Sequence, residues 1–285
     1  MNKRRKKLEH ANPVKVIVFI IFLIEGLTMA YAIFWAIASS LNTHTDLILN
    51  GLALPKKLHF KNYLDAFTVL QTSDASFLEM MWNTVWLTVG KSFVSLACMV
   101  MAAYAFARFE FVGKKTIMAI MMIALLIPVY GNGSATLKMY MRLGMYDSPL
   151  FLAASASALG MMTLIIKTFF QNIPMAYEES AKLDGASTLR IFLQIHIPMV
   201  RTSLFSIFIL QFIDGWNDYA TSIYYLPSYP TIASGLFVYE SLSKFAMNKP
   251  VYFAGVMLCA IPPMIVFTLF NDKLMTNISV GGLKG

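Results

Sequence analysis

Residues 174–198 read Pro-Met-Ala-Tyr-Glu-Glu-Ser-Ala-Lys-Leu-Asp-Gly-Ala-Ser-Thr-Leu-Arg-Ile-Phe-Leu-Gln-Ile-His-Ile-Pro. This stretch is too polar to cross a membrane, although long apolar runs lie on both sides of it. Pro174 is suited to open a helix, and Glu178 and Glu179 then fall in its first turns, where the helix dipole favours anions. Gly185 is suited to a left-handed carboxyl cap, and a second short helix would run on to Pro198, which starts the next span.

The composition on either side of this stretch indicates a protein that folds in lipid. Of its 285 residues, 58% are hydrophobic and only 13% are charged. A helix needs roughly 20 apolar residues to cross a bilayer. Six segments meet this requirement: 14–39, 81–107, 116–136, 150–170, 202–222 and 251–271. The sequence therefore predicts an all-α integral membrane protein with six transmembrane helices.

The positions of Lys and Arg predict the orientation of these helices. The side that holds both termini and the 174–198 stretch carries thirteen, against seven on the opposite side. Because positive residues gather in cytoplasmic loops, both termini should be cytoplasmic. The net charge of +8 is then explained by topology and membrane lipid, and no nucleic-acid motif accompanies it. The predicted organisation is a basic tail (1–13), a first transmembrane helix (14–39), an extracytoplasmic segment (40–76), a transmembrane core (77–271) and a cytoplasmic tail (272–285).

The helix that begins at Pro174 is suited to dock against another protein. The small residues Ser180 and Ala181 would let a partner approach closely, and Glu179 offers a carboxylate to a basic group. The alternative is an amphipathic connector lying on the membrane surface. From these residues alone both interpretations stay open.

The spacing within this stretch resembles a family signature. Glu179-Ser180-Ala181 is followed after three residues by Gly185, after nine more by Ile195, and then by Ile197-Pro198. This pattern resembles the "EAA" loop of ABC importer permeases. Two departures, Ser180 at the second position and Ile197 where Leu is common, are conservative in size.

A broader resemblance, to the maltose-type carbohydrate permeases, extends over nearly the whole chain. It rests on several short motifs rather than on one. They are Asn83-Thr84, Ala102–Arg108, Pro128, Leu143-Gly144, Trp216-Asn217-Asp218 and the terminal Gly281–Gly285.

The resemblance implies a type I ABC importer permease fold and a defined set of partners. It implies a second permease in a heterodimer, two ATPase subunits, an extracytoplasmic solute-binding protein, and a carbohydrate as substrate in a bacterial or archaeal plasma membrane. ATP and magnesium would be bound by the ATPases and no cofactor by this chain. The residues expected to couple to the ATPase are Glu178, Glu179, Ser180, Ala181, Asp184, Gly185, Ile195 and Pro198.

The chain carries no recognisable catalytic or metal centre. A phosphate-binding loop needs GxxxxGK[ST], but Gly90-Lys91-Ser92 has Val85 in place of the first glycine. His196 is interpreted as a packing or capping residue, since no metal-ligand cluster accompanies it. The alternatives are a membrane-embedded enzyme, a structural or receptor subunit, and an importer of another solute such as glycerol phosphate or a polyamine.

Charged residues inside the apolar segments suggest two further hypotheses. Glu25 and Lys91 each lie about ten residues into a span, near mid-depth, and could pair; separate snorkelling or contact with a partner permease is the alternative. Asp214, Trp216, Asn217 and Asp218 could line a substrate pathway by hydrogen bonds and an aromatic face, with plain helix packing as the alternative.

Overall fold

The computed structural model describes residues 13–52, 54–72, 75–127, 131, 133–242 and 247–280, with the backbone alone for 242 and 271–280. Within these residues every regular element is helical. The elements are α1 (Pro13–Ser40), α2 (His44–Leu49), α3 (Lys61–Val69), α4 (Phe77–Arg108), α5 (Lys114–Leu126), α6 (Gly133–Arg142), η1 (Pro149–Ser155), α7 (Met161–Gln171), α8 (Met175–Leu183), α9 (Thr188–Ile191), η2 (Phe192–His196), α10 (Ile197–Trp216), α11 (Tyr219–Tyr225), α12 (Ile232–Leu242) and α13 (Lys249–Val280).

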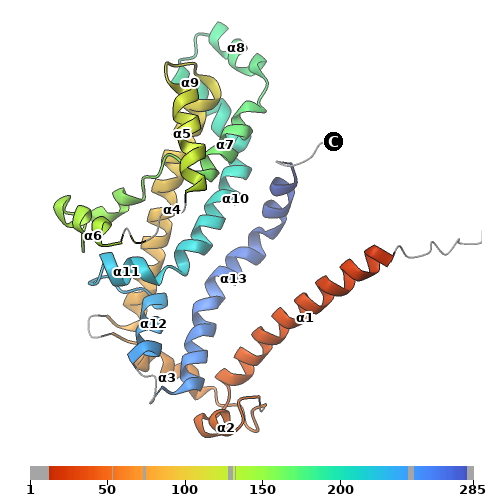
Figure 1. Ribbon diagram of the computed structural model, residues 1–285, viewed down its shortest axis with the longest axis vertical. Coiled ribbons are helices and arrows are strands. Elements are labelled where there is room, and N and C mark those ends of the chain that lie inside the picture. The colour runs from red at the N-terminus through yellow and green to blue at the C-terminus, as the bar shows by residue number, and fades with distance from the viewer. Residues whose placement is uncertain are drawn as a thin grey trace, which may run out of the picture.

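The long helices form an elongated bundle (Figure 1). Helix α4 packs against α7 and α10, and α10 packs in turn against α13. Helices α8 and α9 lie at one end of the molecule, and α2 and α3 lie at the other. The polar stretch 174–198, which contains α8 and α9, therefore lies at the opposite end of the molecule from α2 and α3.

Four helical segments in the described part of the chain are long and apolar enough to cross a membrane. They are Pro13–Ser40, Phe77–Arg108, Thr188–Trp216 and Lys249–Phe270. They correspond to the first, second, fifth and sixth predicted spans. The total of six spans stays a prediction, because the third and fourth segments have a different form.

The third predicted span, 116–136, is not one continuous helix. Helix α5 has only 13 residues and ends at Leu126, which gives it a length of about 20 Å. Ile127 is extended, with φ −95° and ψ 108°, because the residue before a proline is forced out of the helical region by the ring of Pro128. Residues 128–130 and 132 lie outside the described residues.

The fourth predicted span, 150–170, is also interrupted. A 3-10 segment, η1, covers Pro149–Ser155, and α7 begins only at Met161. Between them lie residues 156–160, Ala-Ser-Ala-Leu-Gly, and Gly160 has a fully extended backbone with φ 176° and ψ 179°, which ends any helical continuation toward α7. Helix α7 has 11 residues, too few to cross a bilayer alone.

The fifth span begins earlier and ends earlier than predicted. The helical run is continuous from Thr188 to Trp216, and Pro198 stands in the first turn of its longest part, α10. The π-helical turn η2 precedes this proline. A wider turn accommodates a residue that has no N–H and whose ring crowds the preceding turn. The run stops at Trp216, and α11 starts at Tyr219.

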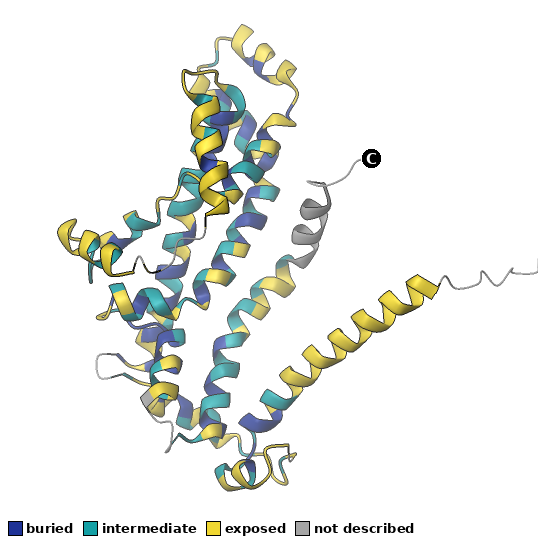
Figure 2. Cartoon of the chain, viewed as in Figure 1, coloured by how far each residue is buried: buried dark blue, intermediate teal, exposed yellow. Residues whose placement is uncertain are grey.

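Helix α1 is exposed over almost its full length (Figure 2). Its buried residues are confined to its last turn: Ala38, Ser39 and Ser40. An apolar helix with no protein cover suits a lipid environment. Helix α1 packs against α13, and within this contact the rings of Trp35 and Phe253 meet edge to face at a centroid distance of 4.9 Å.

The sixth span agrees with the prediction, but its helix is longer: α13 continues to Val280, so residues 272–280 of the predicted tail are helical, and residues 281–285 lie outside the described residues. Residues 1–12 of the predicted basic tail also lie outside them.

Candidate functional site

Helix α8 ends in the left-handed turn that the sequence predicts. Gly185 has φ +78°. Its N–H donates to the carbonyl of Lys182 at 3.0 Å, and the N–H of Ala186 donates to the carbonyl of Ala181 at 2.9 Å. These two bonds form a Schellman motif, which satisfies the last carbonyls of the helix and reverses the chain. The turn brings α9 back toward the bundle.

The residues of the predicted docking helix divide between two faces. Glu178 and Ala181 are buried, whereas Glu179, Ser180, Asp184 and Gly185 are exposed. Exposure of Glu179 and Ser180 leaves a carboxylate and a small residue free to meet a partner. Ile195 is half-buried and Pro198 is exposed, both on the helical run that follows.

Behind α8 lies a cluster of three buried ionisable side chains that the sequence reasoning did not connect. The side chains of Arg108, Glu178 and His196 are 4%, 9% and 0% exposed. Oε2 of Glu178 lies 4.0 Å from Nη1 of Arg108 and 4.0 Å from Nε2 of His196. Its Oε1 forms an ion pair with Nζ of Lys182 at 2.8 Å. The cluster joins three helices, α4, α8 and the run leading into α10.

Arg108 ties the end of α4 to the turn before α8. Its Nη2 donates to the carbonyls of Phe170 and Ile173, at 2.6 and 2.7 Å. The carbonyl of Phe170 lies in the last turn of α7 and that of Ile173 just beyond the helix, where backbone acceptors lack the regular i to i+4 partner. A guanidinium is suited to this task because its donors are held in a rigid fork. The signal in the sequence is Arg108 at the end of a long apolar run, where it enters the charge count and the Ala102–Arg108 motif but has no predicted partner.

A cavity of about 660 Å³ lies between α4, η1, α10 and α11. Its charged lining residues are Lys91, Asp214 and Asp218. Lys91 is paired with Asp218, since its Nζ lies 2.6 Å from Oδ2 of that carboxylate. Nζ also donates to Oγ1 of Thr221 at 3.2 Å. Two of the four predicted pathway residues, Asp214 and Asp218, therefore line a cavity.

Aromatic rings form one wall of this cavity. Tyr140 meets Phe151 edge to face at 5.3 Å and meets Tyr225 in the same way at 5.1 Å. All three line the cavity together with the amide of Gln211. No apolar periodicity singles out these aromatic residues, because they come from three separate elements that only the fold brings together.

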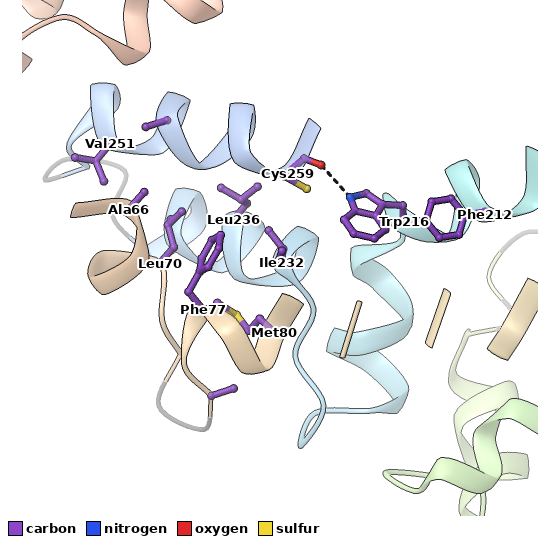
Figure 3. Packing of buried hydrophobic residues seen from close by; sticks show 12 residues of the cluster. Ala66, Leu70, Phe77, Met80, Phe212, Trp216, Ile232, Leu236, Val251 and Cys259 are labelled. Atoms are coloured by element: carbon purple, nitrogen blue, oxygen red, sulfur yellow. Dashed lines mark hydrogen bonds between the residues drawn. The ribbon is translucent and has the colours of Figure 1, made fainter. Parts of the chain in front are cut away.

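The other two predicted pathway residues lie elsewhere. Trp216 is 2% exposed and belongs to the apolar core beside α13, where its Nε1 donates to the carbonyl of Cys259 at 2.9 Å (Figure 3). Asn217 lines a separate cavity of about 310 Å³ and donates to the carbonyl of Ile213. Trp216 therefore has the packing role that was the alternative to a pathway role. A buried indole is stable here because its N–H finds an acceptor.

Glu25 and Lys91 are not brought together. Glu25 is exposed on α1, whose principal contact is α13, whereas Lys91 on α4 pairs with Asp218. Glu25 and Lys91 are at similar depths in their spans, but similar depth does not make them neighbours, because depth along the membrane normal does not determine which helices are adjacent.

Metal-binding chemistry has no support in the described part of the chain. No group of three or more His, Cys, Asp or Glu side chains in it is arranged to hold a metal ion. His196 contacts the rings of Tyr104 and Phe170 instead, at centroid distances of 5.2 and 6.3 Å. The packing role expected for His196 agrees with these contacts.

Long apolar helices, a polar helical loop at one end and a polar cavity between the spans define a multi-pass membrane protein of the transport class. Residues 95–279 match the family described as binding-protein-dependent transport system inner membrane component. That match covers more than half of the chain, so the chain belongs to this family, whose members are the non-catalytic membrane subunits of ABC importers.

Similar proteins extend this assignment over nearly the full length. The galactooligosaccharides transport system permease protein GanQ of Bacillus subtilis is 27% identical over 271 residues, covering 94% of each chain. The diacetylchitobiose uptake system permease protein NgcG of Streptomyces coelicolor is 25% identical over 88% of this chain and 82% of that protein.

A solved structure shares the fold. One chain of the crystal structure of a bacterial ABC transporter involved in the import of the acidic polysaccharide alginate superposes with a TM-score of 0.74 at 22% identity. The superposition covers 94% of this chain and 99% of that chain. The fold is that of a type I ABC importer permease.

Proposed function

We propose that this chain is the permease subunit of a binding-protein-dependent importer that moves a carbohydrate, most simply an oligosaccharide, across the plasma membrane. The observation that carries the carbohydrate assignment is the cavity bounded by Tyr140, Phe151 and Tyr225 with polar groups opposite. Aromatic rings offer apolar faces to sugar C–H groups, and the polar side chains offer hydrogen bonds to hydroxyls. Two relatives are named as permeases for galactooligosaccharides and for diacetylchitobiose, and these names support the same substrate class.

Coupling to ATP hydrolysis is proposed to run through α8. Its exposed face, with Glu179 and Ser180, would lie in a cleft of an ATPase subunit, and Glu179 would pair with a basic residue there. Glu178, Ala181, Asp184 and Gly185 would hold the shape of the helix and its turn, and Ile195 and Pro198 would join it to α10. Nucleotide can move the spans only if it binds one arrangement of the complex more tightly than another.

The assembly proposed for this chain follows from its family. A second permease would form a heterodimer with it, two ATPase subunits would bind ATP and magnesium, and an extracytoplasmic protein would deliver the substrate. The exposed helix α1 offers a surface for membrane lipid or the second permease. Excess Lys and Arg on the side of α8 supports a cytoplasmic position for that end and for both termini, in a bacterial or archaeal membrane.

Import of a different solute, such as glycerol phosphate, is the second candidate. It would require groups that neutralise a phosphate, and the one cation among the described cavity residues, Lys91, is already paired with Asp218. This observation favours a carbohydrate. A membrane-embedded enzyme has less support, since the family match assigns a transport role.

The test is ATP hydrolysis by the reconstituted complex, measured with its second permease, ATPase and binding protein over a panel of sugars. We expect stimulation by one class of sugar in the wild type and its loss in Glu179→Lys. Glu110→Lys is the matched control, because Glu110 is exposed on a different loop and, among the described residues, forms its ion pair with Lys114 alone. Indifference to every sugar would reject the substrate class, and normal stimulation in Glu179→Lys would reject the coupling role of α8.

A further inference from the structure

The charges that line the cavity do not cancel. Its three charged lining residues are one lysine and two aspartates, so the described wall carries a net charge of −1. The carbohydrate class proposed above does not specify the charge of the substrate. The fold does not specify it either, because the similar transporter of known structure imports an acidic polysaccharide.

Lys91 is not available to an anionic ligand. Its Nζ is held by Oδ2 of Asp218 at 2.6 Å and by Oγ1 of Thr221 at 3.2 Å. Asp218 is fixed in turn, because its Oδ1 accepts the N–H of Thr221 at 2.9 Å and caps the first turn of α11. Moving Lys91 toward a ligand would leave a half-buried carboxylate unpaired and loosen the start of that helix.

Asp214 is the charge that remains. It lies four residues before Asp218, is exposed on the cavity side of α10, and within the described residues its carboxylate has no hydrogen-bond or ion-pair partner. Close to it in sequence, Gln211 lines the same cavity with a buried Oε1 that has no hydrogen-bond partner in the described part of the chain. Because that amide oxygen is buried, the exposed carboxylate of Asp214 is the charged acceptor that a ligand in the cavity can reach, and it favours a ligand that supplies donors.

From this arrangement, and resting on the proposed function, we infer that the importer selects uncharged or amino-bearing saccharides and rejects acidic ones, with Asp214 as the residue that sets this selection. Hydroxyl groups and ammonium groups both donate to a free carboxylate. A uronate, sulfonate or phosphate would instead bring a second negative charge beside Asp214, and the two like charges would repel each other.

The experiment measures transport into proteoliposomes by the complete importer. The substrates are the neutral saccharide that the wild type transports and the same saccharide with one primary hydroxyl oxidised to a carboxylate. The affinity of the binding protein for each is measured first, and both are supplied at saturation, so that the ratio of transport rates reports the permease. We expect the neutral form to move at least about tenfold faster in the wild type.

Variants at Asp214 then test the residue itself. Asp214→Asn, which keeps the size of the side chain, should bring the ratio of neutral to acidic transport toward one, and Asp214→Lys should favour the acidic form. Glu110→Gln, which removes an exposed carboxylate remote from the cavity, should leave the ratio unchanged. Equal transport of the two saccharides by the wild type, or an unchanged ratio in an active Asp214→Asn importer, would overturn the inference alone. An importer that hydrolyses ATP but moves neither saccharide nor any other sugar would overturn the proposed function as well.

Discussion

Glu178 and Glu179 are adjacent in the sequence, but their side chains have opposite environments. Glu178 is buried against Arg108 and Lys182, whereas Glu179 is exposed. Neighbouring residues of a helix with 3.6 residues per turn point about 100° apart, so one carboxylate holds α8 on the protein and the other is left for a partner. Two acidic residues that look equivalent in the sequence should therefore behave differently when each is replaced.

Glu178→Gln should destabilise the permease, whereas Glu179→Gln should not. Glutamine keeps the shape of Glu178 but removes the charge that faces Arg108, and an uncompensated buried charge costs on the order of 3 kcal/mol. Glu179→Gln is a surface change worth less than about 0.5 kcal/mol. Thermal unfolding of the purified permease pair, followed alongside sugar-stimulated ATPase activity, separates the two effects. Equal loss of stability in both variants would contradict the division into two faces.

Replacing Arg108 should loosen the turn between α7 and α8. Arg108→Met removes the donors to the carbonyls of Phe170 and Ile173, and we expect a loss of roughly 3 kcal/mol because Glu178 also loses the buried one of its two cationic neighbours and keeps Lys182. Arg108→Lys keeps the charge but not the fork, so its effect should be intermediate. Hydrogen exchange in residues 170–183 is the measurement. Arg142→Met, an exposed arginine at the end of α6, should leave that exchange unchanged.

Much of the fold followed from the apolar runs and from one polar loop. Spans one, two, five and six are predictable because a continuous apolar run can be buried only in lipid or in a core. The end of α8 is predictable because few residues other than glycine adopt the φ of +78° found at Gly185. The breaks at Ile127 and Gly160 were missed because the apolar pattern continues through both segments. The sequence does contain a stop signal next to Ile127. It is Pro128, which enters the prediction as a family motif although a proline also disfavours a helical residue before it.

The partners of the intramembrane charges could not be predicted in the same way. Lys91 lies 127 positions from Asp218, and no local pattern relates two residues that far apart. Hydropathy gives the depth of a residue but not the direction of its side chain around the helix axis. The same limit explains Trp216: Asp214 and Asp218 line the cavity, while the indole two positions from each of them points into the core (Figure 3).

Gly185→Ala should weaken α8 through backbone strain alone. A Cβ at this position would meet no atom within 4 Å, so the cost comes from holding alanine at positive φ, about 1–2 kcal/mol. Gly26→Ala is the matched control: it also meets nothing within 4 Å but lies within α1 at an ordinary φ. There alanine should be neutral or stabilising by up to about 1 kcal/mol. Unfolding midpoints of the two variants test the comparison, and equal shifts would exclude a special conformation at Gly185.

The pairing of Lys91 with Asp218 predicts a measurable coupling between the two positions. Lys91→Met leaves the carboxylate unpaired, Asp218→Asn leaves the ammonium unpaired, and the double variant leaves neither. Asparagine remains a good helix cap, so Asp218→Asn retains the capping of α11. Because both side chains are about a quarter exposed, we expect a coupling free energy of roughly 1 kcal/mol rather than that of a fully buried pair.

A second cycle distinguishes this pair from the one that matching depth suggested. Glu25→Gln combined with Lys91→Met should give additive changes in unfolding free energy, within about 0.5 kcal/mol, because residues on helices that do not touch act independently. The measurement is chemical unfolding of the purified permease pair, carried out for both cycles under the same conditions. Strong coupling between Glu25 and Lys91, with none between Lys91 and Asp218, would mean that α1 packs against α4 in the assembled importer and that Lys91 changes partner there. Coupling in the Asp218 cycle alone would establish that the ion pair seen in the cavity is present in the purified permease pair.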